Sequence, residues 1–218
     1  MKFKAILFDL DGTLLDTLQD LANCANFALS QLGFPQHKLE QYRFFVGDGV
    51  ENLMKRILPK DSVNEYNRCA CLEIMNRQYS KRWNENTKPY AGIPDLLDAL
   101  TELNYPMAVL SNKPDNFTKL TAAKLLGDWQ FKIVLGAREH VPLKPDPTAA
   151  LEIADKINTK PAEILYVGDT NTDIQTANAS GMYAAGALWG FRDAGELKAN
   201  GAKVLIEKPL EILDILQN

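Results

Sequence analysis

The sequence is poor in cysteine and histidine, with only Cys24, Cys69, Cys71, His37 and His140. The odd cysteine count and the lack of a C-x-x-C pair argue against a disulfide framework and a cysteine-ligated zinc site. We expect free thiols in a reducing cytoplasm. Two histidines exclude a site built from three or more histidine ligands.

Long apolar runs and strong charge are also missing. No apolar stretch approaches the roughly 20 residues that span a bilayer, and the N-terminus carries no signal-peptide pattern. We therefore expect a cytoplasmic protein with no membrane partner. The 218 residues carry a net charge of −4 without a basic cluster, which argues against a nucleic-acid partner. Local cations still permit a small anionic substrate. Monomer and dimer both stay open.

The sequence predicts that residues 17–84 are nearly all helical. Between residues 17 and 84, apolar residues recur at helical spacing, and no convincing strand interrupts them. We expect helices over about 18–32 and 37–45, a third opening at 47–49, and a long fourth over about 62–83.

The remainder alternates short apolar strands with helices. Expected strands follow one another at 107–110, 131–135, 164–167, 183–187 and 203–206. Such alternation indicates a parallel sheet with right-handed crossovers, and the apolar run at 5–8 must join it. The predicted fold class is α/β. A doubly wound parallel sheet core (1–16 with 85–218) carries an inserted α-helical cap (17–84).

Polar side chains follow several of these strands. The carboxyl ends of parallel strands share one edge of a sheet, so residues that follow them are expected to meet. The residues in question are Asp9, Asp11, Ser111, Asn112, Lys144, Asp169 and Asp173.

This set suits phosphoryl transfer. Asp9 is placed to attack phosphorus and form an aspartyl-phosphate. Asp11 is placed to protonate the leaving oxygen and later to deprotonate the attacking water. Asp9 and Asp169 suit Mg²⁺ as direct ligands, and Asp173 suits it directly or through an intermediary.

The other polar residues suit the phosphate itself. Lys144 would offset the negative charge that gathers on the transferring group, and Ser111 with the amides near Asn112 would hold phosphate oxygens. Each motif alone has an ordinary structural explanation, such as a solvated turn for the paired aspartates. Their joint occurrence at successive strand ends favours a site.

The motifs resemble those of the haloacid dehalogenase-like hydrolase superfamily. The resemblance rests on the run from Asp9 to Thr13, on Ser111 and Lys144, and on Gly168-Asp169 with Asp173. It implies a Rossmann-like core, a helical cap inserted after the first motif, and the backbone carbonyl of Asp11 as a further Mg²⁺ ligand. An acid at position 11 is typical of the superfamily's phosphatases and phosphomutases.

A closer resemblance is to bacterial phosphoglycolate phosphatases. It rests on residues 8–17, 46–49, 110–114 and 189–192, and it implies a small phosphate ester, 2-phosphoglycolate foremost, as the substrate. Sugar-phosphate phosphatases, pyrophosphatases and β-phosphoglucomutases share much of this pattern, so these phosphatases and a β-phosphoglucomutase-like isomerase remain alternatives. A third hypothesis is a non-catalytic phosphate-binding module, in which Asp9 or Asp11 would be dispensable for function.

The predicted cap offers groups for a carboxylate. Gly47 and Gly49 flank the start of a helix whose free amides can bind an anion. Arg43 lies about one helical turn earlier, and its planar guanidinium can bind a carboxylate through two hydrogen bonds. We expect Arg43 to be the main residue of the cap that recognises the substrate. That Arg43 is only a solvated surface arginine is an equal alternative. Lys113 is a second candidate cation, although an ordinary structural role is favoured for it.

Overall fold

The fold is known from a computed structural model that describes residues 3–217. A six-stranded sheet with strand order β5-β4-β1-β6-β7-β8 forms its centre, and all of its paired strands run parallel. From β1 the chain winds outward to β5, returns to β6 beside β1, and winds outward again to β8. The strands are β1 (Ala5–Phe8), β4 (Met107–Pro114), β5 (Phe131–Ala137), β6 (Ile164–Gly168), β7 (Tyr183–Ala187) and β8 (Val204–Ile206).

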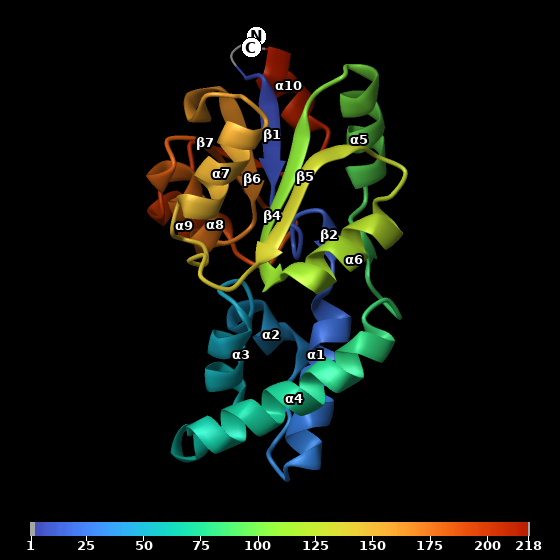
Figure 1. Ribbon diagram of the computed structural model, residues 1–218, viewed down its shortest axis with the longest axis vertical. Helices are drawn as coiled ribbons and strands as arrows, with labels where there is room; N and C mark the ends of the chain where they lie inside the picture. Colours follow the sequence, from blue (N-terminus) through green and yellow to red (C-terminus); the bar gives the residue numbers. More distant parts are fainter. Residues whose placement is uncertain (1–2, 218) are drawn as a thin grey trace.

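Helices cover both faces of this sheet (Figure 1). Side chains of a strand alternate between its faces, so Ile6 and Phe8 enter one core while Ala5 and Leu7 enter the other. The first core is completed by α5 (Ile93–Glu102) and α10 (Glu211–Gln217). The second is completed by α7 (Thr148–Lys156), α8 (Asn171–Ala179) and α9 (Ala194–Ala199). The predicted α/β fold class, with a Rossmann-like doubly wound sheet, is confirmed.

Four helices lie together beyond the carboxyl ends of the strands (Figure 1). They pack around a hydrophobic core of their own, which includes Leu29, Tyr42, Met54 and Met75. Their bounds are α1 (Leu18–Gln31), α2 (Leu39–Phe45), α3 (Val50–Ile57) and α4 (Glu65–Arg82).

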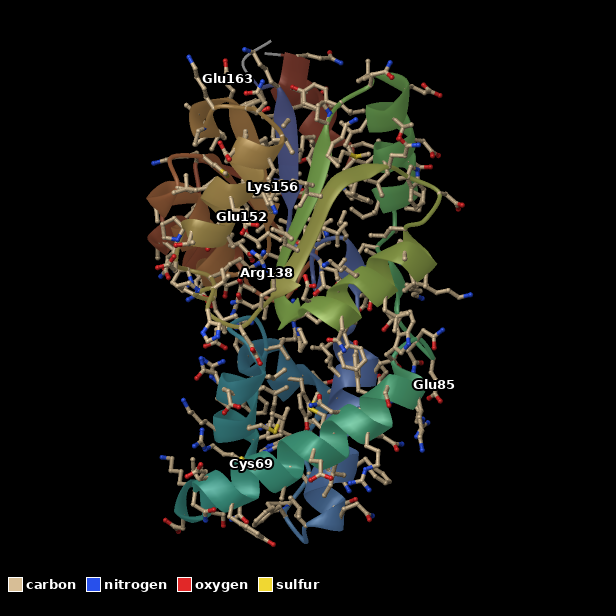
Figure 2. All side chains as sticks on the ribbon, in the orientation of Figure 1. Cys69, Glu85, Arg138, Glu152, Lys156 and Glu163 are labelled. Atoms are coloured by element: carbon tan, nitrogen blue, oxygen red, sulfur yellow. The ribbon has the colours of Figure 1, made fainter. Side chains whose placement is uncertain are left out.

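Free thiols occur both in the core and on the surface of this helical layer. Cys24 and Cys71 are buried in its core, while Cys69 is exposed on α4 (Figure 2). No helix within residues 3–217 has both the length and the apolar character needed to cross a membrane.

Short elements and element ends differ from the expectation. A two-stranded antiparallel sheet, β2 (Leu15–Asp16) with β3 (Lys88–Pro89), joins the segments that lead into and out of the helical layer. Two residues per strand are too few to carry a period-2 signal. Strand β4 also runs on to Pro114, with a register irregularity after Leu110. The remaining elements are α6 (Asp115–Leu125), η1 (Lys60–Ser62) and η2 (Pro161–Glu163).

Asp20 fastens the two connecting segments together. Its side chain is 1% exposed and accepts hydrogen bonds from the backbone and side chains of Asn86 and Thr87 at 2.8–3.1 Å. Burial alone would raise the pKa of Asp20, but these hydrogen bonds lower it below its usual value. The carboxylate therefore stabilises the point where α1 begins and the chain returns to the sheet.

Candidate active site

Three buried carboxylates meet at the carboxyl edge of the sheet. Asp9 follows β1, Asp169 follows β6, and Asp173 lies in the first turn of α8. One carboxylate oxygen from each lies within 4.8 Å of the others. Strands β1 and β6 are adjacent where the winding direction of the sheet reverses, the place where open α/β sheets bind ligands.

Local hydrogen bonds fix the orientation of Asp169. Its Oδ1 accepts from Thr13 Oγ1 at 2.8 Å, and its Oδ2 accepts from the backbone amide of Phe191 at 2.8 Å. Gly12 permits this approach because its φ is +96° and a Cβ there would lie 2.3 Å from the Asp169 carboxylate. The glycine after Asp11 is therefore a steric requirement of the site.

Asp173 is fixed from two sides. Its Oδ2 accepts from the backbone amide and hydroxyl of Thr170 at 3.0 and 2.7 Å, which caps α8. Its Oδ1 accepts from Lys144 Nζ at 2.6 Å. Asp173 thereby holds the lysine in place.

Lys144 supplies one positive charge to these three carboxylates. Its buried ammonium also lies 2.8 Å from Asp9 Oδ1 and donates to the Leu110 carbonyl oxygen at 3.0 Å. Burial alone would lower the pKa of Lys144, but Asp173 and Asp9 raise it well above its ordinary value, so the ammonium stays charged.

The carboxylates keep an excess of negative charge. Burial, followed by the charge of Asp173, raises the pKa of Asp169 to about 7 and that of Asp9 well above its usual range. One ammonium beside three carboxylates leaves two negative charges in the fully ionised cluster. Carboxylate oxygens are the donors that hard divalent cations prefer. The donor set and the charge both fit a divalent metal ion held between Asp9 and Asp169.

Asp11 lies apart from this cluster and is paired with a different cation. Lys113 Nζ donates to both of its carboxylate oxygens, at 2.9 and 3.2 Å, and to the hydroxyl of Tyr79 at 2.7 Å. Ser111 lies beside this pair, since its Oγ accepts from the Lys113 amide at 3.2 Å.

Asn112 joins three segments at this edge. Its side-chain amide donates to the carbonyl oxygens of Gly47 and Lys144 at 3.2 and 3.0 Å, and its Oδ1 accepts from the Lys144 amide at 2.8 Å. These contacts occupy the Asn112 side chain, so only its backbone amide suits the predicted role in phosphate binding.

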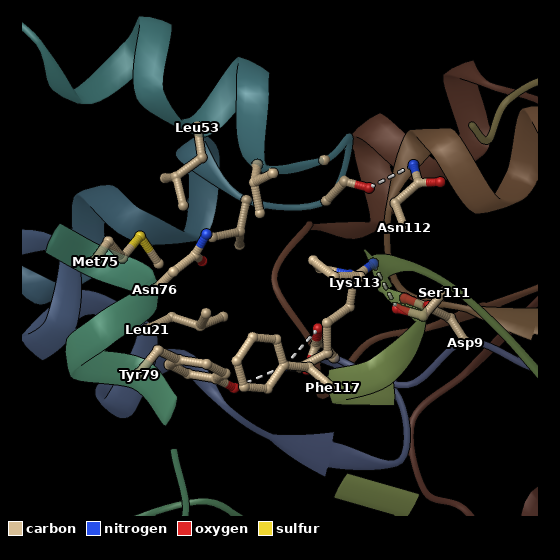
Figure 3. A pocket seen from close by; sticks show the side chains of 16 residues that line it. Asp9, Leu21, Leu53, Met75, Asn76, Tyr79, Ser111, Asn112, Lys113 and Phe117 are labelled. Carbon is tan, nitrogen blue, oxygen red and sulfur yellow. Dashed lines mark hydrogen bonds and ion pairs between the residues drawn. The ribbon is translucent and has the colours of Figure 1, made fainter. Parts of the chain in front are cut away.

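A cavity of about 660 Å³, open to solvent, separates the sheet edge from the helical layer. Figure 3 shows Asp9 and Ser111 on its sheet side, and Leu21, Leu53 and Met75 on its helical side. The polar groups of the sheet edge therefore face a mixed wall on the helical side, where Asn76 and Tyr79 lie among the apolar side chains.

Most of the predicted site residues are brought together here. The cavity is lined by Asp9, Asp11, Gly47, Gly49, Ser111 and Asn112. The Lys144 ammonium contacts Asp9 directly and also contacts Asp173, so it links the two carboxylates. Asp169 completes the carboxylate cluster.

Arg43 does not join them. Its side chain is exposed, is not among the residues that line the cavity, and donates through Nη2 to the carbonyl oxygen of Gly190. In the reverse direction, Arg192 Nη2 donates to the Val46 carbonyl oxygen at 3.0 Å. This geometry does not support Arg43 as a substrate reader, because its guanidinium is engaged where the helical layer meets the sheet domain.

The sequence gives no signal that Tyr79 belongs to the site. It lies on the long helix α4, where apolar and polar residues do not separate onto two faces. The sequence therefore does not predict which side of this helix faces the sheet. For Lys113 the sequence indicates a second candidate cation beside Ser111, with an ordinary structural role favoured. The sequence places it after a strand, but nothing local specifies its contact with Asp11.

Comparison with known proteins identifies the class. The family described as haloacid dehalogenase-like hydrolase matches residues 6–187, and the chain belongs to this family. It is an enzyme, in the class of phosphoric monoester hydrolases to which its named relatives belong.

The relatives carry more specific names. A phosphoglycolate phosphatase of Nitrosospira multiformis is 32% identical over 222 residues, covering 100% of this chain and 97% of that protein. One from Aquifex aeolicus is 30% identical over 215 residues, covering 99% and 97%. A solved structure from Lactobacillus delbrueckii subsp. bulgaricus, provisionally assigned as a phosphoglycolate phosphatase, has a TM-score of 0.93 at 28% identity and 99% coverage of both chains.

Proposed function

We propose that this enzyme is a Mg²⁺-dependent phosphatase that hydrolyses a small phosphomonoester, with 2-phosphoglycolate as the preferred substrate, through an aspartyl-phosphate on Asp9. One observation carries the proposal. The Asp9 carboxylate lines the cavity while it also belongs to the buried carboxylate cluster and contacts the Lys144 ammonium. A nucleophile, a metal-binding cluster and a substrate cavity thus share one residue.

The first chemical step transfers the phosphoryl group to Asp9. A carboxylate oxygen of Asp9 forms a bond to phosphorus while the bond from phosphorus to the ester oxygen breaks. Asp11, which also lines the cavity, donates a proton to the departing oxygen. The alcohol leaves, and the phosphoryl group stays on Asp9.

The second step restores the enzyme. Asp11, now a carboxylate, removes a proton from a water molecule that attacks the phosphorus of the aspartyl-phosphate. The bond between phosphorus and the Asp9 oxygen breaks, and inorganic phosphate is released. Asp11 ends protonated again, ready for the next substrate.

The surrounding residues hold the reacting group. Lys144 fixes Asp9 and offsets charge on the transferring group, while Ser111 and the Asn112 amide are placed to bind phosphoryl oxygens. Asp9, Asp169 and the Asp11 carbonyl would hold Mg²⁺, with Asp173 beside them. When bound, Mg²⁺ supplies Lewis-acid polarisation of the phosphoryl oxygens and offsets the carboxylate charges.

We further propose that residues 17–84 act as a cap that selects the substrate, on a core formed by 1–16 and 85–218. The sheet edge holds only phosphate and metal, so discrimination must come from groups above it. Gly47 and Gly49 bring backbone close to the cavity there. The helical side of the cavity carries apolar side chains such as Leu53 and Met75 together with the polar Asn76 and Tyr79, so both kinds of side chain are available to contact the rest of the ester.

The relatives support the substrate, because proteins named phosphoglycolate phosphatase match over nearly the whole chain. A β-phosphoglucomutase-like isomerase has weaker support. A solved structure from Bacteroides vulgatus, provisionally assigned as a β-phosphoglucomutase, has a TM-score of 0.78 but is only 19% identical to this chain, so it shares the fold alone. We propose a small-molecule substrate and no nucleic-acid or membrane partner. The free thiols favour a reducing, cytoplasmic location.

A substrate panel tests this proposal. Purified enzyme with Mg²⁺ is offered 2-phosphoglycolate, glucose 1-phosphate, glucose 6-phosphate and pyrophosphate, and released phosphate is measured. We expect the highest kcat/KM for 2-phosphoglycolate. A higher value for a sugar phosphate or pyrophosphate would replace the substrate. Conversion of glucose 1-phosphate to glucose 6-phosphate without phosphate release would indicate the isomerase.

A further inference from the structure

A buried lysine joins the helical layer to the side chain of Asp11. Lys113 lies near the end of β4 and is 7% exposed, and Tyr79 lies on α4 and is 4% exposed. The ammonium group donates to both oxygens of Asp11 and to the tyrosine hydroxyl. A group on the sheet side is thereby connected through one cation to a group on the helical side.

These contacts restrict the position of the Asp11 carboxylate. Two donated bonds from a single ammonium oppose rotation of the carboxylate about its own axis. Lys113 and Asp11 form an ion pair whose side chains are 4% and 17% exposed, so both bonds are charge-assisted when Asp11 is ionised, the form that takes a proton from water. When Asp11 carries a proton, one oxygen still accepts from Lys113 and the other holds the proton for the leaving oxygen. Charge-assisted bonds are stronger than neutral ones.

The tyrosine is itself held firmly. Its ring packs edge-on against Phe117 with 5.2 Å between centroids, and its ring also lies near the Lys113 ammonium, 4.9 Å from the centroid. The phenol therefore reaches the lysine from a fixed direction, set by how α4 lies over the sheet edge.

We propose that Lys113 and Tyr79 are positioning residues for Asp11. Through Tyr79, this positioning depends on α4 lying over the carboxyl edge of the sheet. This role rests on the proposed function, in which Asp11 protonates the leaving oxygen. When α4 moves away, Lys113 loses the hydroxyl that orients it, and Asp11 loses its fixed position. Proton transfer is then efficient only in the closed site.

The leaving group of the substrate separates this role from others. An alkoxide leaves only when it is protonated, whereas p-nitrophenolate leaves readily without an acid. The parameter kcat/KM reports the steps up to phosphoryl transfer to Asp9, so later use of Asp11 as a base does not affect it. Ethyl phosphate is an alkyl ester without a carboxylate, which isolates acid catalysis from carboxylate recognition.

The test compares Tyr79→Phe and Lys113→Met with wild type on 2-phosphoglycolate, ethyl phosphate and p-nitrophenyl phosphate. Tyr79→Phe keeps the ring that packs on Phe117. Matched controls are Tyr66→Phe, at an 80% exposed position of the same helix, and Lys124→Met, at an exposed position of α6. Circular dichroism establishes that each variant is folded, and Tyr79→Phe alone suffices if Lys113→Met is not.

We expect kcat/KM on both alkyl esters to fall about tenfold for Tyr79→Phe and roughly 100-fold for Lys113→Met, within the contribution of general acid catalysis. The value for p-nitrophenyl phosphate should change less than about threefold, and the controls should match wild type. Loss on 2-phosphoglycolate alone would assign Lys113 to carboxylate binding and overturn the positioning role. Equal losses on all three esters, or none, would also overturn it. A wild-type enzyme inactive on every ester would instead refute the proposed function.

Discussion

Nζ of Lys144 lies 2.6 Å from Oδ1 of Asp173, and the two side chains are 2% and 0% exposed. The same ammonium contacts Asp9, so one positive charge serves two carboxylates directly while Asp169 lies beside them. Each unpaired buried charge is costly to the fold. The remaining negative charge must therefore be offset by a bound cation or, in the metal-free protein, by a proton on one of the carboxylates.

Activity should require Mg²⁺ and should not be supported by Ca²⁺. Ca²⁺ takes more ligands at longer distances than Mg²⁺ and would misplace the attacking carboxylate of Asp9 relative to phosphorus. The measurement is phosphate release after exhaustive chelation, followed by addition of each ion. Full activity in the chelated enzyme, or with Ca²⁺ alone, would contradict the metal requirement.

The metal-free protein should lose stability as pH rises. Burial raises the pKa of Asp169 to about 7 from an ordinary 3.8, so between these values the folded state keeps a proton that the unfolded chain has lost. The free energy of unfolding then falls between about pH 4 and pH 7, by up to ~1.4 kcal/mol per pH unit, and levels off above. Asp9 contributes in the same direction.

Urea denaturation at several pH values, with and without Mg²⁺, measures this dependence. Mg²⁺ should stabilise the protein more at pH 8 than at pH 5, because ligands bind the ion when deprotonated. Asp169→Asn should flatten the metal-free profile. A wild-type profile no steeper than that of Asp169→Asn would refute the assigned role of this carboxylate.

Arg43→Ala should weaken the attachment of the helical layer without changing substrate preference. The arginine bonds to the Gly190 carbonyl oxygen, and a hydrogen bond of this kind contributes about 1 kcal/mol, or roughly fivefold. We expect similar reductions in kcat/KM for 2-phosphoglycolate and p-nitrophenyl phosphate, with Arg77→Ala on the exposed face of α4 as the control. Loss confined to 2-phosphoglycolate would restore Arg43 as the substrate reader.

Asp20→Ala should destabilise the protein strongly. The change removes the acceptor of bonds from the Asn86 and Thr87 amides at a buried position, where unsatisfied donors are costly. We expect a loss of about 3 kcal/mol in the free energy of unfolding, measured in urea. Asp155→Ala, at an exposed helical position, should change it by less than about 0.5 kcal/mol. Similar values for the two variants would show that Asp20 does not fasten the connecting segments.

The sheet and its carboxyl edge could be predicted because both depend on local signals. Short apolar runs identify the strands, and a residue that follows a parallel strand reaches the shared edge whatever the loops do. Asp9 and Asp169 illustrate this, since neighbouring strands place them side by side. The same reasoning placed Lys144 near them, and its side chain is held there by Asp9 and Asp173.

The cap side of the cavity could not be predicted in the same way. Which side of α2 or α4 faces the sheet depends on how four helices pack around their own core. Helical spacing therefore predicts neither the bond from Arg43 to Gly190 nor the contact of Tyr79 with Lys113. The contacts of Lys113 could not be predicted for the same reason, because its partners come from a strand end and from α4. Such contacts depend on tertiary packing that no single segment encodes.

The central claim, that Asp9 is the nucleophile of a phosphatase, is tested most directly by comparing wild type with Asp9→Asn. Phosphate release from 2-phosphoglycolate is measured for both proteins in the same Mg²⁺ buffer, with circular dichroism to show that the variant is folded. Loss of a covalent nucleophile should reduce turnover by at least roughly 1,000-fold. A folded Asp9→Asn variant that released phosphate at a near-normal rate would contradict the account.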